Sequence, residues 1–284
     1  MKKITILINC KDQKGIIAAV TQYIASIDGN IVYLDQHVDE AENVFFMRLE
    51  CDLQNENWTV AAIKSDFEIR LAQAFSMSWE IYTVAEKPRM ALFVSKYDHC
   101  LFDILGRFSA GELALEIPII ISNHEDLKPI AKRFGIPFFH VPFTKDNKIE
   151  GEKQQIALLQ QHNIDFIVLA RYMQIVTPKL IALYKNKIIN IHHSFLPAFP
   201  GAKPYHSAFN RGVKIIGATS HYVTEELDEG PIIEQDITRV LHSHSIDDFI
   251  MKGRDLERIV LARAIQLHAE RKTMVYSNKT VIFS

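Results

Sequence analysis

The first part of the chain alternates short apolar strands with amphipathic helical segments. Four stretches rich in apolar, β-branched and aromatic residues indicate strands: 3–10, 31–39, 44–52 and 78–84. Two stretches with apolar residues at helical spacing indicate helices: 16–27 and 60–75. The resulting βαββαβ order predicts an α/β module of ferredoxin-like type, with a four-stranded antiparallel sheet and both helices on one face.

The pattern changes after residues 85–89, a charged segment that Pro88 interrupts. We therefore expect two domains, residues 1–86 and residues 87–284. Apolar runs of strand length follow: 90–94, 117–121, 138–141, 166–170 and 188–191. Helical patterns separate most of them: 100–108, 125–134, 152–161 and 178–184. Strands buried on both faces and alternating with helices predict a doubly wound, mostly parallel sheet. A long amphipathic helix over 246–270 and a final strand over 273–283 complete the prediction.

Composition and charge narrow the class of protein. The 284 residues are 48% hydrophobic and 23% charged, which is typical of a folded globular chain. The net charge of −2 favours no nucleic-acid partner, and the apolar run 4–8 is too short to cross a membrane. The cysteines, Cys10, Cys51 and Cys100, are scattered, as expected of reduced thiols in the cytoplasm.

Candidate chemistry gathers at the end of the strand around Asn190. Asn190 and His192 share one face of this strand, at the carboxyl end where open α/β sheets bind ligands. A second polar segment, 218–231, begins as a strand and continues as an acidic turn closed by Gly230-Pro231. A carboxylate beside an imidazole makes a competent proton acceptor. Four acidic residues of this turn are candidates, and the residues alone do not choose among them: Glu225, Glu226, Asp228 and Glu229.

Other chemical classes have less support in the sequence. His192 and His193 point to opposite faces of a strand and have no nearby cysteine, so a zinc site is disfavoured and no metal is expected. The sequence has no G-x-S-x-G, G-x-G-x-x-G or Walker-type loop, and no cofactor is expected. The proline-rich segment 194–206 predicts a rigid pocket wall. His206, at its end, is either a surface or capping residue or a substrate contact.

These motifs resemble the folate-dependent formyltransferase family. The segments are Asn190-Ile191-His192-His193-Ser194-Phe195-Leu196-Pro197, Pro200-Gly201 and residues 224–231. The resemblance implies that Asn190, His192 and Asp228 act on the formyl group of 10-formyltetrahydrofolate, which is a substrate rather than a cofactor. It also implies that residues 171–178 form the pterin-binding loop. The substrate-binding residues expected on this basis are Arg171, Tyr172, Met173, Ile175, Val176, His193, His221, Val223 and Glu225.

The first domain resembles an ACT domain, a small module that often binds an amino acid at a domain interface. The resemblance implies a regulatory ligand site formed by Asp12, Gly15, Ile16 and Asn30, and a homo-oligomer, dimeric or tetrameric, that responds to an amino-acid effector.

Two departures from purine-type formyltransferases bear on the reaction. Those enzymes carry a glycine-containing phosphate loop where this chain has residues 94–100, without glycine and with Asp98. His193 stands where they usually have proline, and is expected to shape the site for water. We therefore predict a hydrolase that converts 10-formyltetrahydrofolate to formate and tetrahydrofolate, supplies formate for purine biosynthesis and balances one-carbon folate pools. The alternatives are formyl transfer to an amine and a non-catalytic folate or amino-acid sensor.

Overall fold

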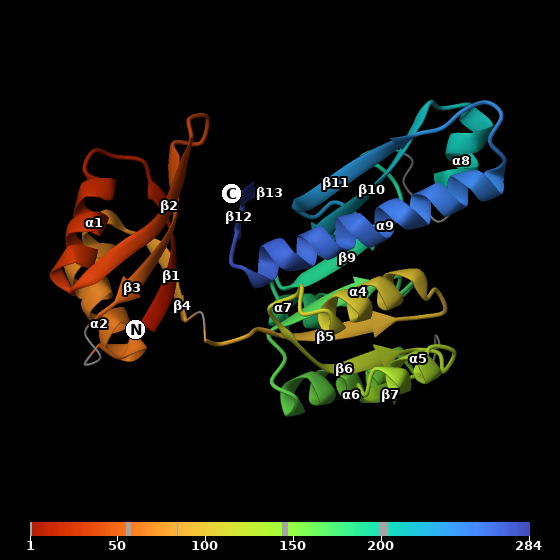
Figure 1. Cartoon of the computed structure of the whole chain (residues 1–284), viewed down its shortest axis with the longest axis horizontal. Coiled ribbons are helices and arrows are strands. Elements are labelled where there is room, and N and C mark those ends of the chain that lie inside the picture. The colour runs from red at the N-terminus through yellow and green to blue at the C-terminus, as the bar shows by residue number, and fades with distance from the viewer. Residues whose placement is uncertain (1, 55–57, 84, 144–146, 199–203) are drawn as a thin grey trace. The chain divides into compact units, whose positions relative to one another are not determined.

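The computed structural model describes residues 2–54, 58–83, 85–143, 147–198 and 204–284 (Figure 1). Two compact units are present. Unit 1 comprises Met1–Lys87 with Arg271–Met274 and Val281–Ser284, and unit 2 comprises Pro88–Glu270 with Val275–Thr280. The division at Pro88 lies at the seam that the sequence suggests, whereas the grouping of the last residues with unit 1 was not expected. Residues 199–203 of the predicted proline-rich loop and Val84 of the predicted fourth strand lie outside the described residues.

Unit 1 is a four-stranded antiparallel sheet in the order β2-β3-β1-β4. Its elements are β1 (Lys2–Lys11), α1 (Ile16–Ser26), β2 (Gly29–Asp39), β3 (Val44–Leu53), α2 (Val60–Phe67), η1 (Glu68–Ala72), α3 (Gln73–Phe75) and β4 (Ser78–Thr83). The predicted helix 60–75 is therefore continuous but contains one π-helical turn. Ile4, Ile6 and Ile8 share a core with α1 and α2 on one face, which confirms the predicted βαββαβ arrangement and is compatible with an ACT-like domain.

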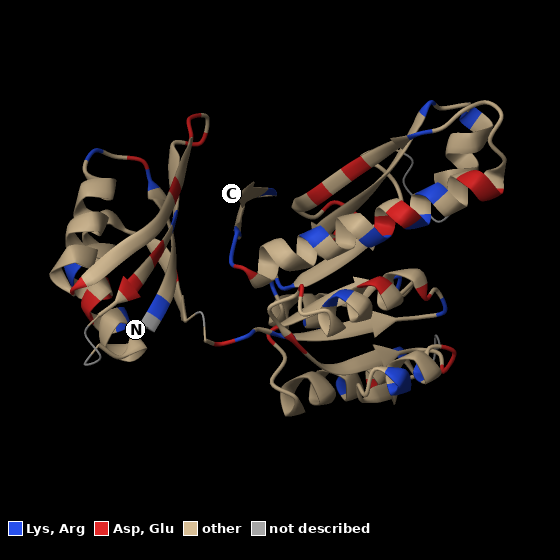
Figure 2. Cartoon of the chain, viewed as in Figure 1, with Lys and Arg blue, Asp and Glu red and all other residues tan. Residues whose placement is uncertain are grey.

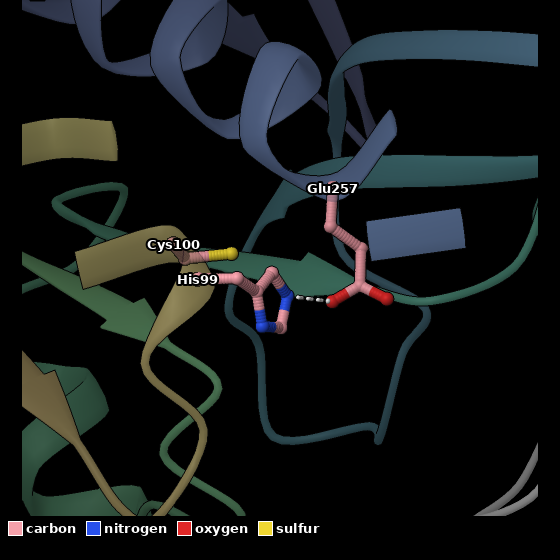
Figure 3. A group of neighbouring side chains, drawn as sticks. All are labelled: His99, Cys100 and Glu257. Atoms are coloured by element: carbon pink, nitrogen blue, oxygen red, sulfur yellow. Dashed lines mark hydrogen bonds and ion pairs between the residues drawn. The ribbon is translucent and has the colours of Figure 1, made fainter. Parts of the chain in front are cut away.

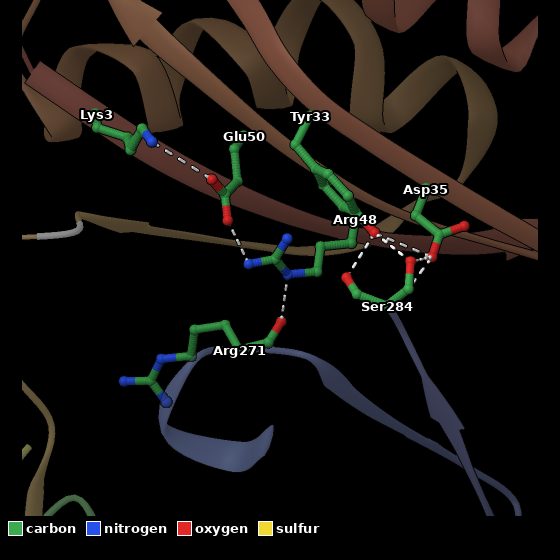
Figure 4. A network of polar contacts seen from close by, with 7 residues as sticks. All are labelled: Lys3, Tyr33, Asp35, Arg48, Glu50, Arg271 and Ser284. Atoms are coloured by element: carbon green, nitrogen blue, oxygen red, sulfur yellow. Dashed lines mark hydrogen bonds and ion pairs between the residues drawn. The ribbon is translucent and has the colours of Figure 1, made fainter. Parts of the chain in front are cut away.

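The other face of this sheet carries the polar network of Figure 4. Arg48 alternates with the core residues of β3, is 3% exposed and donates to the Glu50 carboxylate at 2.5 Å. Its Nε also donates to the Arg271 carbonyl oxygen at 3.0 Å. The Tyr33 hydroxyl donates to the Ser284 carbonyl oxygen at 2.7 Å. The last residues of the chain are thereby held on the sheet face opposite the helices.

Unit 2 is built on a seven-stranded sheet in the order β11-β10-β9-β8-β5-β6-β7. Its strands are β5 (Arg89–Val94), β6 (Glu116–Ser122), β7 (Phe138–His140), β8 (Phe166–Ala170), β9 (Ile188–His192), β10 (Ile215–Tyr222) and β11 (Ile232–Arg239). Strands β5 to β9 pair in parallel, and β10 and β11 continue the sheet antiparallel. The mostly parallel, formyltransferase-like sheet that the sequence predicts is confirmed.

Helices cover both faces of this sheet. Alternate residues of β5 divide between two cores: Leu92 packs with α4 (His99–Ser109), α5 (Lys128–Arg133) and α9 (Ile246–Ala269), and Phe93 packs with α6 (Lys148–Gln161) and α7 (Pro178–Leu183). A further short helix, α8 (Pro204–Arg211), precedes β10. Basic and acidic residues are interspersed along α9 (Figure 2).

Two details differ from the sequence-based expectation. The prediction of a single final strand over 273–283 is wrong, because the segment is a hairpin of β12 (Thr273–Tyr276) and β13 (Lys279–Ile282). Its turn contains Ser277 at φ +51°, a left-handed conformation that interrupts a strand. The polar strand β11 was not anticipated. Among the described residues, no helix combines the length and apolar character that a membrane span requires.

Candidate active site

The candidate site lies where β9 pairs with β10. The antiparallel register sets Asn190 opposite His221 and His192 opposite Thr219. Asn190 and His192 lie two residues apart on β9 and therefore share one face of the sheet. The polar strand end singled out from the sequence thus receives a second imidazole from the neighbouring strand.

Asp228 links the two imidazoles. Its Oδ2 lies 3.2 Å from His192 Nδ1, and its Oδ1 lies 3.7 Å from His221 Nε2. Asn190 Nδ2 lies 3.2 Å from His221 Nε2, which closes a compact group of four side chains. The other acidic residues of the turn, Glu225, Glu226 and Glu229, are exposed. The structure therefore singles out the one carboxylate that approaches both histidines.

The turn before β11 is shaped to present Asp228. Asp228 adopts φ +59°, a left-handed conformation that aspartate tolerates better than most residues. A Cβ on Gly230 would lie 1.8 Å from the Tyr222 carbonyl oxygen, so only glycine fits there. The Tyr222 amide donates to the Pro231 carbonyl oxygen at 2.9 Å, which fastens the turn to the end of β10.

The histidines hold Asp228 in its ionised form. Burial raises the pKa of this carboxyl, but the hydrogen bond from His192 and the nearness of both imidazoles lower it by more, and the net pKa falls well below its usual range. The group is consequently a carboxylate throughout the neutral pH range, and it favours a proton on the ring nitrogen of His192 that faces it.

Hydrogen bonds also define the tautomers of the two imidazoles. His221 Nδ1 lies 2.9 Å from the Tyr222 carbonyl oxygen, which accepts only, so Nδ1 carries a proton. Nε2 of a neutral His221 then accepts a hydrogen bond from one hydrogen of the Asn190 side-chain amide. The second hydrogen of that amide stays available to donate to a substrate. His192 donates from Nδ1 to Asp228, and its buried Nε2 has no hydrogen-bond partner among the described residues. The arrangement offers one unpaired basic nitrogen and one amide donor.

The predicted pterin loop begins directly after β8, the strand next to β9. Arg171 and Met173 adopt left-handed conformations at φ +60° and +56°. Tyr172 between them is buried, its carbonyl oxygen accepts from the Ser95 hydroxyl, and its own hydroxyl accepts from Gln155 Nε2 at 2.7 Å. The loop is thus anchored at Tyr172, where its backbone turns sharply.

The apolar side chains of this loop face outward or lie half-buried. Met173 is 51% exposed and Ile175 is 64% exposed, whereas Val176 is half-buried against the core on one face of the sheet. Exposed apolar side chains beside a polar strand end suit contact with a flat heteroaromatic ring.

The remaining predicted substrate residues are dispersed around this strand end. His193 is buried, with its ring centroid 5.3 Å from that of His192. The Val223 amide donates to the Ile188 carbonyl oxygen at 2.9 Å, which continues the β9–β10 pairing. Glu225 lies exposed on the acidic turn, and His206 lies exposed in α8.

Two buried polar residues near the site were missed by sequence reasoning. The Thr219 hydroxyl donates to the Ser194 carbonyl oxygen at 2.9 Å and accepts from the Leu196 amide at 3.1 Å, which holds the segment after His193 against β10. Glu257 of α9 is 1% exposed. Neither residue belongs to a motif, and only their burial in the folded chain reveals them.

The predicted effector residues of unit 1 lie in two separate groups. Asp12, Gly15 and Ile16 follow the end of β1, which pairs with Val44 at the start of β3, whereas Asn30 pairs near the end of β3. Helix α1 (Ile16–Ser26) runs between the two groups and separates them by about 16 Å, which is more than one amino acid can span. A site that uses both groups therefore needs two copies of the chain.

Comparisons with known proteins agree with the fold. Residues 88–265 match the formyl transferase family. The chain is 53% identical to a formyltetrahydrofolate deformylase from Synechocystis, over 99% of this chain and 98% of that protein. It is 45% identical to the Bacillus subtilis formyltetrahydrofolate deformylase, over 98% of this chain and 93% of that protein. The crystal structure of a formyltetrahydrofolate deformylase from Pseudomonas syringae superposes with a TM-score of 0.97 at 45% identity, covering 100% of this chain and 95% of that one.

The family match covers residues 88–265, which include the whole seven-stranded sheet, so unit 2 is a formyl transferase domain. The matches extend through unit 1 and over nearly the full length of both chains, beyond the region that the family shares. Within the formyl transferases, the chain belongs to the formyltetrahydrofolate deformylase family.

Proposed function

We propose that the enzyme hydrolyses 10-formyltetrahydrofolate to formate and tetrahydrofolate at the strand end of unit 2. Membership of the deformylase family supports the reaction, and the observation that carries the site is the contact of Asp228 with His192 at 3.2 Å. A carboxylate that orients an imidazole with an unpaired second nitrogen is the arrangement expected of a general base.

In the first step, water attacks the formyl carbon while His192 Nε2 accepts its proton. The Asp228 carboxylate holds the Nδ1 proton and stabilises the imidazolium that forms, as its lowered pKa allows. General-base assistance of this kind contributes roughly two to four powers of ten in rate.

Attack turns the formyl oxygen into an oxyanion of a tetrahedral intermediate. The second Nδ2 hydrogen of Asn190 is available to donate to this oxygen, because the first is engaged by His221 at 3.2 Å. His221 thereby fixes the orientation of the amide before the substrate arrives. Loss of one such donor costs on the order of 3 kcal/mol in the transition state.

Collapse of the intermediate breaks the bond between the formyl carbon and N10. The imidazolium of His192 returns its proton to N10, so tetrahydrofolate leaves as a neutral amine. The formic acid that remains loses its proton to solvent at neutral pH. Atoms and charges balance in these steps, and we propose that the reaction needs no cofactor.

The folate ring is proposed to lie against the loop after β8. The exposed side chains of Met173 and Ile175 provide apolar contact, and the backbone groups of Arg171 to Val176 supply directional hydrogen bonds. His193, His221, Val223 and Glu225 complete the proposed substrate-binding set, the last of them from the exposed acidic turn.

Release of formate in the absence of an amine acceptor tests this function. The enzyme is incubated with 10-formyltetrahydrofolate in buffer that contains no primary or secondary amine, and formate and tetrahydrofolate are measured together. We expect steady, equimolar release of both products. A requirement for an added amine indicates a formyltransferase instead, and binding of folate without any turnover indicates a sensor.

Three wider roles remain proposals for this chain. We infer that the formate serves purine biosynthesis and that the reaction balances one-carbon folate pools. A cytoplasmic location is supported by the three free, buried cysteines. A homo-oligomer with an amino-acid effector is supported by the separation of Asp12 from Asn30 along β3, since two copies are needed to join them. Equilibrium sedimentation with and without amino acids tests the last of these.

A further inference from the structure

We propose that a cavity of unit 2, which Arg171 at the start of the pterin loop helps to line, binds a small carboxylate, and that its ligand is the formate released by the enzyme. The inference deepens the proposed function, because formate is a product of that reaction. The cavity has a volume of about 230 Å³ and is lined by residues from the segment after β5, the loop after β8, and helices α8 and α9.

The charges in this cavity favour an anion. Two guanidinium groups, those of Arg171 and Arg254, face a single carboxylate, that of Glu257. Burial raises the pKa of Glu257, but the hydrogen bond from His99 and the charge of Arg171 lower it by more. The pKa therefore lies below its usual value, and the group is ionised. Two fixed positive charges against one negative charge leave the cavity electropositive even when its histidines are neutral.

The one carboxylate is already engaged by donors of the protein. The Glu257 Oε2 lies 2.8 Å from His99 Nε2, and its Oε1 accepts from the Tyr205 hydroxyl at 2.6 Å. Arg171 Nε lies 3.4 Å from Oε2 but makes no hydrogen bond among the described residues, although the side chain is only 9% exposed. A buried guanidinium with donor capacity to spare therefore lines the cavity.

Arg254 is the second arginine that lines the cavity. Its Cζ lies 5.9 Å from the ring centroid of Tyr97, and the Cζ of Arg171 lies 5.0 Å from the same centroid. Within the described parts of the chain, Arg254 has no carboxylate within ion-pair distance. One aromatic ring thus positions two guanidiniums, and the planar fork of each matches the two oxygens of a carboxylate.

A metal ion is the competing ligand and fits less well. His99, Cys100 and Glu257 lie close together, with their donor atoms within 4.8 Å of one another (Figure 3). Arg171 lies 3.4 Å from the same carboxylate and would repel a cation. Burial and the charge of Glu257 also raise the pKa of Cys100 well above its usual range, whereas a metal requires the thiolate.

Formate fits because the cavity begins next to the proposed base. The His193 ring lines the cavity, and its centroid lies 5.3 Å from that of His192 and 5.7 Å from that of Tyr205. Formate forms beside the Asp228 carboxylate, which repels it, whereas this cavity, which His193 helps to line, is electropositive. A product site here separates formate from tetrahydrofolate, which leaves along the pterin loop.

The test is a titration of the folate-free, full-length enzyme with ¹³C-formate, followed by the line width of the formate resonance at constant ionic strength. A ligand of so few atoms binds in the millimolar range, roughly 1–10 mM. We expect Arg254→Gln to weaken binding at least about fivefold and Arg254→Lys to weaken it less, since lysine keeps the charge but loses the fork. The control is Arg258→Gln, one turn along α9, where the arginine is paired with Asp255, and it should bind formate like the wild type.

Three results would overturn the site: no binding beyond that of chloride, equal binding by wild type and Arg254→Gln, or stronger competition by inorganic phosphate than by unlabelled formate. A further arm adds tetrahydrofolate. Formate binding should persist, and its loss would mean that the carboxylates of the folate tail occupy the cavity instead. The titration needs no turnover, so it tests the formate site separately from the proposed reaction. If the enzyme binds formate but does not hydrolyse 10-formyltetrahydrofolate, the proposed reaction is contradicted and the formate site is not.

Discussion

The replacement Asp228→Asn removes one charge from the proposed active site and keeps the shape of the side chain. In the wild type, the carboxylate lies 3.2 Å from His192 Nδ1 and 3.7 Å from His221 Nε2. An asparagine oxygen can still accept from His192, so the ring stays in place, but the imidazolium formed during catalysis loses its counter-charge.

The size of the effect follows from this distance. Unit charges separated by 3.2 Å attract by about 5 kcal/mol at an effective dielectric constant of about 20. Since about 1.4 kcal/mol is a factor of ten in rate, the loss of this attraction lowers kcat by at most about three to four powers of ten. The residual amide contact and partial solvent access of Asp228 reduce the loss, and we expect a decrease of about a thousandfold.

The assay is the initial rate of formate release at saturating 10-formyltetrahydrofolate, together with the folate dissociation constant from fluorescence quenching. We expect kcat to fall about a thousandfold while the dissociation constant changes less than about threefold, because Asp228 faces the histidines and not the pterin loop. Glu226→Gln is the matched control, since it removes an exposed carboxylate from the same turn, and it should retain wild-type kcat. An Asp228→Asn enzyme with more than a tenth of wild-type kcat would refute the reasoning.

Three further predictions concern stability and reactivity. Gly230→Ala places a Cβ 1.8 Å from the Tyr222 carbonyl oxygen and should destabilise unit 2 by about 3 kcal/mol or more in urea unfolding, whereas an unchanged midpoint would mean that the turn adapts. Because the histidines lower the pKa of Asp228, the wild type should be more stable than Asp228→Asn above about pH 4 and lose this advantage as the pH falls further, as urea titrations from pH 6 to pH 3 will show; a constant difference would contradict it. Burial raises the pKa of the Cys51 thiol to about 12, so it should react with iodoacetamide only after unfolding, and rapid labelling of the native protein would contradict its burial.

Periodicity predicted most of the fold because each element buries one clear apolar set. The runs that became β5 and β8 are apolar on both faces, and this pattern is typical of a covered parallel sheet. The edge strand β11 escaped prediction because Glu234, Gln235 and Asp236 interrupt its apolar residues, and its pairing with β10 supplies what the pattern lacks. The turn at Ser277 was missed although Ser277 and Asn278, between the two β-rich runs, are residues that favour turns.

The candidate site was predictable in part. Asn190 and His192 violate the apolar pattern of a buried strand, so physical reasoning finds them without a structure. The choice of Asp228 over its acidic neighbours depends on a left-handed backbone at that residue and on the close packing of Gly230, and neither is visible in composition. Family resemblance supplied that choice, and the contact with His192 gives it a physical basis.

Glu257 shows the limit of sequence reasoning most clearly. A single glutamate on a long helix rich in charged residues is usually solvent-exposed, and no motif marks it. Its burial depends on donors from α8, the start of α4 and the loop after β8, which are distant in the sequence and meet only in the folded unit. Long-range convergence of this kind cannot be derived from local patterns.

The most direct test of the account is hydrolysis of 10-formyltetrahydrofolate in H₂¹⁸O, with mass analysis of the formate and quantification of tetrahydrofolate. If water attacks the formyl carbon, each formate formed should carry one ¹⁸O atom, and tetrahydrofolate should appear in equal amount. The rate of labelled formate should fall about a thousandfold with Asp228→Asn. Unlabelled formate, or label at an undiminished rate in that variant, would contradict hydrolysis by the Asn190, His192 and Asp228 site.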